Sequence, residues 1–306
     1  MVELKLTEND VKRTFVFSGD LGHRNSPILR DFHHLDTADV VMMESTYGNR
    51  LHRDWSETFD EVTDIVKAVR NGKGNVLIPA FAVGRSQMIL YMLAKHREDW
   101  GIADWRIFLD SPMAIEATNI YLDHNNLYDE AAAAFWAENG KSLGMDNLHF
   151  TRTGKESMVI NKVKSGAIII AGSGMCTGGR IRHHLKHNVW RPECHVIIPG
   201  YQSYGTTGRK LVEGAKFIKL WGEKIKVAAK IHTVGGLSAH ADQDGILSWY
   251  KSFKNAPPAL MVHGDPDVMR DLGDTIKTQT GGTAHIAQAG KTVDLIDLEA
   301  LRKPTL

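Results

Sequence analysis

The sequence predicts an α/β protein organised around a doubly wound parallel sheet. Short apolar runs of strand length alternate with segments whose apolar residues recur at helical spacing, and several of the runs end in a glycine-rich loop. Repeated strand–loop–helix units are typical of parallel sheets, because consecutive parallel strands need a crossover connection. With 306 residues, of which 42% are apolar, the chain can bury one large core or two ordinary ones.

The N-terminal part predicts three strands, two of which lead to a carboxylate. Apolar and polar residues alternate over 2–7, and a turn follows before a second apolar run at 14–17, which predicts a hairpin. The second strand runs into a turn that presents Asp20, and the apolar run 40–43 ends in Glu44. Capping of a following turn or helix explains either carboxylate equally well.

The middle of the chain predicts alternating helices and strands, and the pattern closes near Gly222 before a final strand–helix–strand succession. The predicted helices cover 59–69, 86–95, 129–139 and 241–253, and the predicted strands cover 75–78, 105–109, 167–171, 195–199, 227–234 and 259–262.

Three loops that follow buried strands predict a phosphate site. They are 81–86, 172–180 and 200–208, and amides at the start of a helix attract anions. Tight turns alone explain the glycines of any one loop, and none has the spacing of a dinucleotide fingerprint or a P-loop. Three such loops at one sheet edge favour a phosphate-rich ligand. The candidate binding residues are Arg85, Ser86, Ser173, Gly174, Met175, Thr177, Gly178, Arg180, Tyr201, Gln202, Thr206 and Gly208.

Two strand ends in the C-terminal part each deliver a histidine. His240 lies in the sequence Ser-Ala-His-Ala-Asp that ends at Asp242, and His263 follows the apolar run 259–262. Either one alone is as well explained as an ordinary loop histidine. Carboxylate and imidazole are zinc ligands, so Asp20 and His263 are candidate metal ligands. Two ligands fall short of the three that a hydrolytic zinc centre needs.

Composition excludes several other classes. The net charge of +1 gives no general signal for a nucleic-acid binder, although a local basic groove stays open. Cys176 and Cys194 lie outside any metal-ligand spacing, which argues against a disulfide scaffold and for a reducing cytoplasm. The sequence has no run long enough to span a membrane, and a cytoplasmic location is expected. The pair His33 and His34 is a weak metal candidate, because adjacent side chains point apart.

Taken together, the motifs resemble those of the β-CASP nucleases, metallo-β-lactamase-fold RNA enzymes that include RNase J and the endonuclease of eukaryotic pre-mRNA cleavage and polyadenylation. The resemblance runs from Val2 to about Leu298. The motifs occur in the family order and are Ser18-Gly-Asp-Leu-Gly, Glu44-Ser-Thr-Tyr-Gly, Ile78-Pro-Ala-Phe-Ala-Val-Gly-Arg-Ser, Asp110-Ser-Pro-Met-Ala, Ser173-Gly-Met, Gly200-Tyr-Gln, Ser238-Ala-His-Ala-Asp and Val262-His-Gly.

The resemblance implies a partial metallo-β-lactamase αβ/βα domain interrupted by a doubly wound parallel-sheet β-CASP domain. Residues 1–50 and 223–306 are expected to belong to the first domain, and residues 51–222 to the second.

The resemblance also implies roles for single residues. Asp20 matches the carboxylate that bridges two zinc ions, and His263 matches the last zinc-binding histidine. Glu44 matches the acidic residue that orients a neighbouring histidine. His240 matches the histidine proposed as general acid and lies in the motif that also contains Asp242. Glu44, His240 and Asp242 are therefore the candidate catalytic residues. The glycine loops would hold the RNA backbone or its 5′ phosphate.

One departure from the family pattern is clear. The motif His-x-His-x-Asp-His and the next histidine ligand precede, in the family, the segment that Val2-Glu-Leu matches, and the sequence lacks both. We therefore expect a family member without its N-terminal half-domain. A late start codon or partial gene model accounts for this, as does a split or degenerate protein whose missing half is another chain. Apolar faces and edges of strands 15–17 and 40–43 are expected to be exposed, which favours association.

The predicted function is zinc-dependent hydrolysis of RNA phosphodiesters in RNA processing, by endonuclease or 5′–3′ exoribonuclease action. Zinc binding by this polypeptide alone is expected to be weak and its activity nearly absent. The alternative is a noncatalytic RNA-binding or partner-binding module, although Glu44, His240 and His263 are not required for folding and argue against long degeneration. Lactam or thioester hydrolysis is disfavoured, because it has no need of the phosphate-suited insertion. The expected partners are single-stranded RNA and a second copy in a homodimer, with no membrane.

Overall fold

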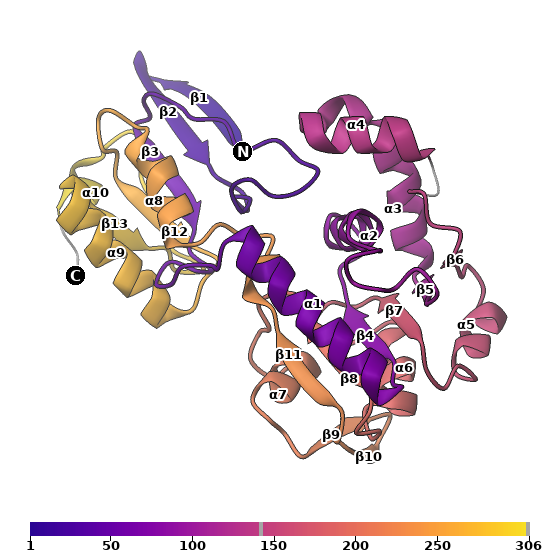
Figure 1. Ribbon diagram of the computed structural model, residues 1–306. Helices are drawn as coiled ribbons and strands as arrows, with labels where there is room; N and C mark the ends of the chain where they lie inside the picture. Colours follow the sequence, from indigo (N-terminus) through magenta and orange to yellow (C-terminus); the bar gives the residue numbers. More distant parts are fainter. Residues whose placement is uncertain (141–142, 304–306) are drawn as a thin grey trace. The chain divides into compact units, whose positions relative to one another are not determined.

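The computed structural model describes residues 1–140 and 143–303, and its contacts divide the chain into two compact units (Figure 1). Unit 1 consists of Met1–Ser26, Asp31–His52 and Ala239–Leu306, and unit 2 consists of Pro27–Arg30 and Arg53–Ser238.

Unit 1 is built on a five-stranded sheet in the order β1-β2-β3-β12-β13. β1 and β2 form an antiparallel hairpin that turns at Asn9 and Asp10, whose positive φ angles of 48° and 65° suit a tight two-residue turn. Every other pairing is parallel. The predicted hairpin is therefore present, with these strand bounds: β1 (Val2–Glu8), β2 (Val11–Phe17), β3 (Val40–Glu44), β12 (Ala259–Val262) and β13 (Ala284–Ile286).

Helices cover both faces of this sheet. The helices α8 (Gln243–Lys251) and α9 (Pro266–Thr280) pack against one face, where Trp249 and Tyr250 are fully buried. The short helix α10 (Glu299–Arg302) contributes Leu301 to the apolar cluster on the other face.

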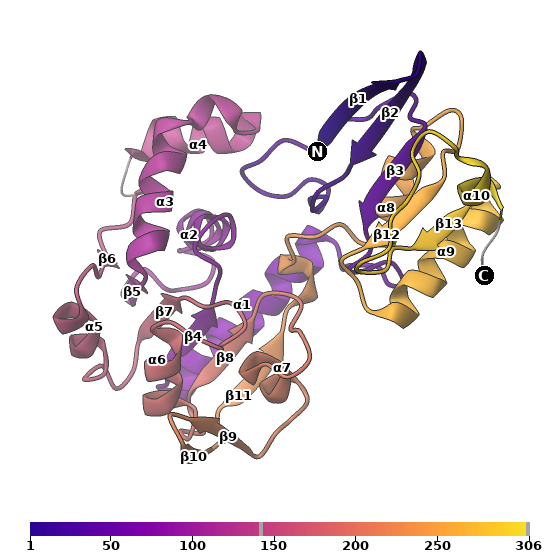
Figure 2. The same ribbon diagram turned by 180° about the vertical axis from the view of Figure 1, so that it is seen from behind.

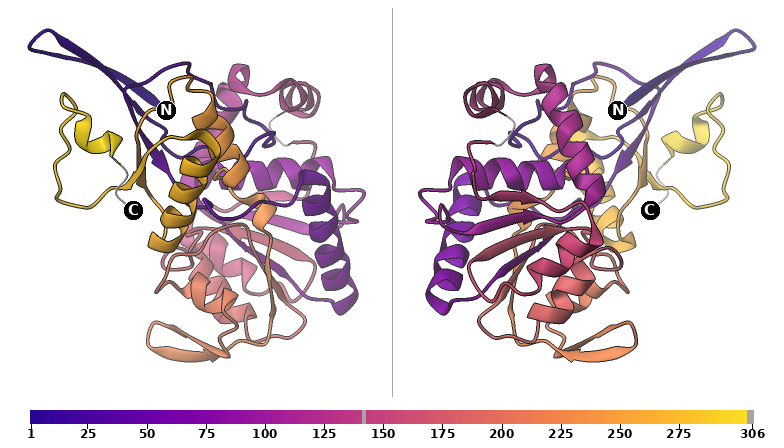
Figure 3. Two further views of the ribbon diagram at one scale, coloured as in Figure 1. Left: turned by 90° about the vertical axis from the view of Figure 1, so that its left-hand side faces the viewer. Right: turned by 90° about the vertical axis from the view of Figure 1, so that its right-hand side faces the viewer.

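The prediction that strands 15–17 and 40–43 expose apolar faces is wrong for most of their residues. Phe15, Val16, Val40 and Val41 are buried, because α8 and α9 cover one face and C-terminal residues around α10 cover the other. The exposed apolar side chains lie instead on the edge strand β1, where 53% of Val2 is accessible to solvent. Figure 3 shows the β1–β2 hairpin, in indigo, extending out of its unit.

Unit 2 contains a six-stranded sheet in the order β11-β8-β4-β7-β5-β6, and all of its pairings are parallel. This is the predicted doubly wound sheet. Its inner strands β4 and β7 are entirely apolar because both of their faces are covered, whereas the edge strands β11 and β6 carry polar residues. The strand bounds are β4 (Val76–Pro79), β5 (Arg106–Leu109), β6 (Leu148–Phe150), β7 (Ala167–Ala171), β8 (His195–Ile198) and β11 (Lys230–Thr233).

The helices of unit 2 divide between the two faces. Figure 1 shows α1 in front of the sheet, and Figure 2, from behind, shows α6 and α7 before it. The first helix begins at a capping box formed by Asp54 and Glu57. One face is covered by α1 (Trp55–Gly72), α2 (Arg85–Lys95), α3 (Pro112–Asp123) and α4 (Glu130–Asn139), and the other by α5 (Gly154–Ile160), α6 (Ile181–Asn188), α7 (Thr207–Val212) and the hairpin of β9 (Phe217–Leu220) and β10 (Glu223–Lys226).

Among the described residues, no helix combines the length and the apolar character that crossing a bilayer requires. Cys176 and Cys194 are both buried free thiols, and burial raises the pKa of Cys176 to about 12.

Candidate metal centre and phosphate-binding loops

The candidate metal and catalytic residues of unit 1 lie where three neighbouring parallel strands end. Asp20 follows β2, Glu44 is the last residue of β3, and His263 follows β12. β3 pairs with both other strands, so their carboxyl ends lie at one edge of the sheet. His240 joins them from the segment before α8, through an isolated bridge to Gly22.

Three of these residues could hold a metal ion together. One ligand atom each from Asp20, His240 and His263 lies within 4.8 Å of the others, and Nδ1 of His263 is 3.5 Å from Oδ1 of Asp20. A carboxylate oxygen and two imidazoles are ligands that zinc accepts, and Asp20 and His263 are exposed enough to receive it. The donor set fits zinc in kind, but it amounts to only part of a dinuclear site.

His240 is oriented by a buried carboxylate. Oε2 of Glu44 accepts from Nδ1 of His240 at 2.8 Å, and Oε1 accepts the amide of Leu21 at 2.6 Å. Only 1% of Glu44 is exposed, so both oxygens are held in fixed positions. Because the proton on Nδ1 is engaged with Glu44, the acid–base chemistry of the His240 ring falls to Nε2.

Two further side chains of this site were not among the predicted residues. The hydroxyl of Thr46 lies 3.3 Å from Nδ1 of His263 and 3.4 Å from Nδ1 of His240. His52 donates from Nε2 to the carbonyl of His240 at 3.1 Å, and burial is the main cause that lowers the pKa of His52. Thr46 lies in the Glu44-Ser-Thr-Tyr-Gly motif, two positions after Glu44, and this motif is the signal that could have found it.

Asp242 serves as a helix cap in the structure. Its Oδ1 accepts the amide of Gly245 at the start of α8, and its Oδ2 accepts the amide of His52 at 3.0 Å. Both oxygens are therefore bound to backbone amides, a geometry that favours a positioning role. A catalytic role for Asp242 remains a prediction.

The turn after β12 depends on a close backbone approach. His263 has a positive φ of 54°, and a Cβ on Gly264 would lie 2.7 Å from the carbonyl oxygen of Ser45. Only glycine fits at this point, and the close approach brings the end of β12 against the end of β3.

In unit 2 the three predicted phosphate loops meet. They follow β4, β7 and β8, which are neighbours in the sheet. Nε2 of Gln202 donates to the carbonyl of Gly174 at 3.0 Å, and the amide of Gly208 donates to the carbonyl of Met175 at 3.0 Å. The 81–86 turn joins them, because a Cβ on Gly174 would lie 2.7 Å from the ring of Phe81.

Several hydroxyl groups of these loops bond to the loops themselves. Oγ of Ser173 accepts the amides of Thr177 and Gly178 at 3.2 and 3.1 Å. Oγ1 of Thr206 caps α7 by accepting the amide of Arg209, and Ser86 donates to the carbonyl of Phe81. These bonds define the loop shapes, and contacts of the same side chains with RNA remain predictions.

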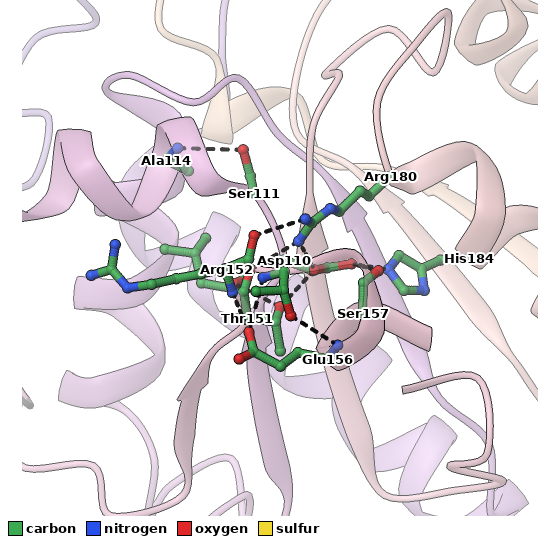
Figure 4. Close-up of polar contacts among 11 residues, drawn as sticks. Asp110, Ser111, Ala114, Thr151, Arg152, Glu156, Ser157, Arg180 and His184 are labelled. Atoms are coloured by element: carbon green, nitrogen blue, oxygen red, sulfur yellow. Dashed lines mark hydrogen bonds and ion pairs between the residues drawn. The ribbon is translucent and has the colours of Figure 1, made fainter. Parts of the chain in front are cut away.

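Arg85 and Arg180, the two arginines predicted to bind phosphate, are not fully exposed to solvent and both contact other side chains. Only 7% of Arg85 is exposed, and its Nη1 lies 3.3 Å from the sulfur of Met88. Arg180 turns toward a buried carboxylate, Asp110, which follows β5 (Figure 4). Tyr201 lies at the start of the 200–208 loop and is half-buried.

Asp110 is the centre of a buried polar cluster that the sequence did not predict. His184 of α6 donates to its Oδ2 at 2.6 Å, and Ser157, Thr151 and Arg180 add bonds of 2.6, 2.6 and 2.7 Å. Burial alone would raise the pKa of Asp110, but the hydrogen bonds from His184, Ser157 and Thr151 outweigh it and hold the pKa at about 2. Because Arg180 ends the 172–180 loop, the cluster fastens that loop to the ends of β5 and β6.

Comparison with known proteins agrees with this architecture. The Beta-Casp domain family matches residues 86–211, and the Zn-dependent metallo-hydrolase RNA specificity domain matches residues 224–287. Ribonuclease TTHA0252 of Thermus thermophilus is 35% identical over 281 residues, which are 92% of this chain and 64% of that protein.

Two archaeal proteins are also similar. An RNase J-like protein of Methanocaldococcus jannaschii is 31% identical, with 76% of this chain and 53% of that protein covered. Transcription termination factor FttA of Pyrococcus abyssi is 31% identical, with 79% and 39% covered. The chain thus spans between 39% and 64% of the length of these three relatives.

Two domain matches, similarity to a ribonuclease over 92% of this chain and the strand-edge site agree with one another. The chain belongs to the β-CASP family of metallo-β-lactamase-fold RNA nucleases.

Proposed function

We propose that this protein takes part in zinc-dependent hydrolysis of RNA phosphodiesters, as an endonuclease, a 5′–3′ exoribonuclease or both. The observation that carries the proposal is the convergence of Asp20, Glu44, His240 and His263 at one strand edge of unit 1. The relatives named ribonuclease and RNase J-like support RNA as the substrate class.

The residues divide the chemistry between them. Asp20 and His263 would hold zinc, which when bound supplies an activated water and stabilises charge on the phosphate. His240, with its Nδ1 fixed by Glu44, would give a proton from Nε2 to the departing ribose oxygen. The loops at 81–86, 172–180 and 200–208 would hold the phosphates of the RNA chain.

For the 306-residue polypeptide by itself we propose weak zinc binding and little or no cleavage. Its sequence contains no His-x-His-x-Asp-His, and the described residues bring together only three candidate ligands. The same observation favours the second candidate function, a noncatalytic RNA-binding or partner-binding module. The domain limits 1–50, 51–222 and 223–306 and a homodimer are also proposals, and the exposed edge strand β1 supports the latter.

RNA cleavage and RNA binding test these functions separately. A 5′-labelled single-stranded RNA is incubated with the polypeptide, with zinc for cleavage and with EDTA for a gel-shift assay. We expect a retarded complex in EDTA and no products with zinc. Cleavage that His263→Ala abolishes and His34→Ala spares would overturn the proposed inactivity. The absence of any complex would overturn RNA as the ligand.

A further inference from the structure

The β9–β10 hairpin of unit 2 presents one apolar and one basic face. Ile218 and Leu220 point into the core that also contains residues of α6. The register pairs Phe217 with Lys226 and Lys219 with Lys224, and strand alternation places these four on the opposite face. All four are exposed, so the solvent-facing side of the hairpin consists of three lysines and one phenyl ring.

Positive charge is concentrated here in a chain whose net charge is only +1. Lys216 and Lys230 flank the hairpin and are also exposed. The one acidic residue of the hairpin, Glu223, is engaged by Lys186 of α6 at 2.6 Å. In the part of the chain that the structure describes, Lys219, Lys224 and Lys226 form no ion pair, so their charge is not neutralised internally.

Aromatic rings are interleaved with these charges. Phe217 and Trp221 are 47% and 46% exposed. The ammonium of Lys224 lies 4.3 Å from the ring centre of Phe217, and the guanidinium of Arg182 lies 4.3 Å from that of Trp221. The ring of His183 is 4.4 Å from that of Trp221. Exposed rings beside cations are what proteins use to stack unpaired bases while neutralising phosphates.

The basic face continues from the phosphate loops. Arg182 lies two residues after Arg180, which ends the 172–180 loop, and it reaches Trp221 of the hairpin. Figures 1 and 2 show β9 and β10 beside α6 at the rim of unit 2 from both sides. The hairpin therefore contacts the helix that directly follows one of the phosphate loops.

We propose that the β9–β10 hairpin and the first turn of α6 form an accessory surface for single-stranded RNA, outside the metal centre. Lys219, Lys224 and Lys226 neutralise phosphates, and Trp221 and Phe217 stack bases. The proposal rests on the proposed RNA-directed function and extends it by placing a second segment of the ligand. Because neither contact reads base edges, the surface binds without sequence preference.

Fluorescence anisotropy with a labelled oligouridine in EDTA tests the surface without any contribution from metal or cleavage. Lys219→Gln/Lys224→Gln is compared with Lys5→Gln/Lys12→Gln, which removes two exposed lysines from the other hairpin. We expect the first pair to weaken binding about fivefold or more and to lower the slope of log K against log salt by about 1.4. The control pair should change the affinity less than about twofold and leave the slope unchanged.

Trp221→Ala separates stacking from charge. We expect it to weaken binding about tenfold with an unchanged salt slope, because base stacking involves no counterion release. Urea denaturation confirms that each variant is folded before binding is interpreted.

The outcomes separate the two proposals. If the wild type binds RNA and neither Lys219→Gln/Lys224→Gln nor Trp221→Ala weakens this binding, the accessory surface is overturned and the proposed function stands. Equal weakening by the control pair overturns it too, because the effect would then be one of net charge. Competition by polyglutamate as effective as that by unlabelled RNA would assign the surface to acidic peptides and overturn the proposal. Failure of the wild type to bind RNA overturns the proposed function itself.

Discussion

Nδ1 of His240 lies 2.8 Å from Oε2 of Glu44, and the two residues are 196 positions apart in the sequence. Glu44 is buried at the end of β3, and its other oxygen holds the amide of Leu21. A buried carboxylate with both oxygens occupied by donors links three segments of unit 1 at the point where the candidate metal ligands gather.

Removal of the Glu44 carboxylate should destabilise the fold, contrary to the expectation from sequence that folding does not require this residue, because the structure buries it with two hydrogen-bond donors. Glu44→Leu keeps the side-chain bulk but leaves the amide of Leu21 and Nδ1 of His240 without their acceptor. We expect the free energy of unfolding to fall by about 1–3 kcal/mol, measured by urea denaturation. As a control, substitution of the exposed Glu8 by leucine (Glu8→Leu) should change the free energy of unfolding by less than about 0.5 kcal/mol. A loss at Glu44 no larger than that at Glu8 would show that the buried bonds contribute nothing.

The ligand assignment predicts an unequal response of zinc affinity to substitution. Asp20→Asn and His263→Ala should each weaken zinc binding about tenfold or more, because each removes a proposed ligand. His240→Ala should weaken zinc binding less than about threefold, because Nδ1 of His240 contacts Glu44 and the role proposed for this ring is proton transfer. Competition with a chromophoric chelator measures all three, and the exposed His34→Ala is the matched control. Weakening by His240→Ala as large as that by His263→Ala would make His240 a ligand and contradict its role as acid.

The Asp110 cluster predicts a pH dependence at the acidic end. The pKa of this carboxyl is held at about 2, below the usual 3.8, so its contribution to stability is complete above about pH 4 and is lost as the pH falls through 2. That contribution is on the order of 2 kcal/mol. Asp110→Asn should therefore be less stable than the wild type at pH 7, and the difference should narrow between pH 4 and pH 2. Urea denaturation across this range measures it, and a difference that stays constant would contradict the assignment.

The contact between two phosphate loops predicts a steric effect at Gly208. A Cβ there would lie 1.6 Å from Oε1 of Gln202, so this side chain must move and its bond to the carbonyl of Gly174 in the neighbouring loop is disturbed. The same Cβ would lie 3.1 Å from the carbonyl of Met175, which is a tight contact between the two loops. Gly208→Ala should weaken RNA binding measured by anisotropy and cost about 1–3 kcal/mol of unfolding free energy. Gly154→Ala, where nothing lies within 4 Å of the added atom, is the control and should leave both unchanged. RNA affinity equal in the two variants would show that the loop contact has no part in binding.

Strands were the most predictable part of this fold. β7 and β12 have the predicted bounds, because a strand covered on both faces is a continuous apolar run that local sequence displays. The Asp110 cluster was hidden, since His184 and Ser157 are 74 and 47 positions from the carboxylate that they contact.

The predicted exposure of strand faces failed for a related reason. The segment around α10 that covers Phe15 and Val40 lies far from them in the sequence. Its short pattern of apolar residues did not indicate which strands it would pack against. Thr46, likewise, contacts histidines 194 and 217 positions away. Family motifs placed the ends of strands, whereas contacts between distant segments had to come from the structure.

The central claim is that this polypeptide alone binds zinc weakly and does not cleave RNA. It is tested most directly by measuring the zinc content by mass spectrometry after dialysis against metal-free buffer. The same sample is assayed for cleavage of single-stranded RNA. The account predicts well under one zinc ion per chain and no products, because the proposed ligands Asp20 and His263, with His240 beside them, supply at most part of a dinuclear site. Two retained zinc ions per chain, together with cleavage that His263→Ala abolishes, would contradict it.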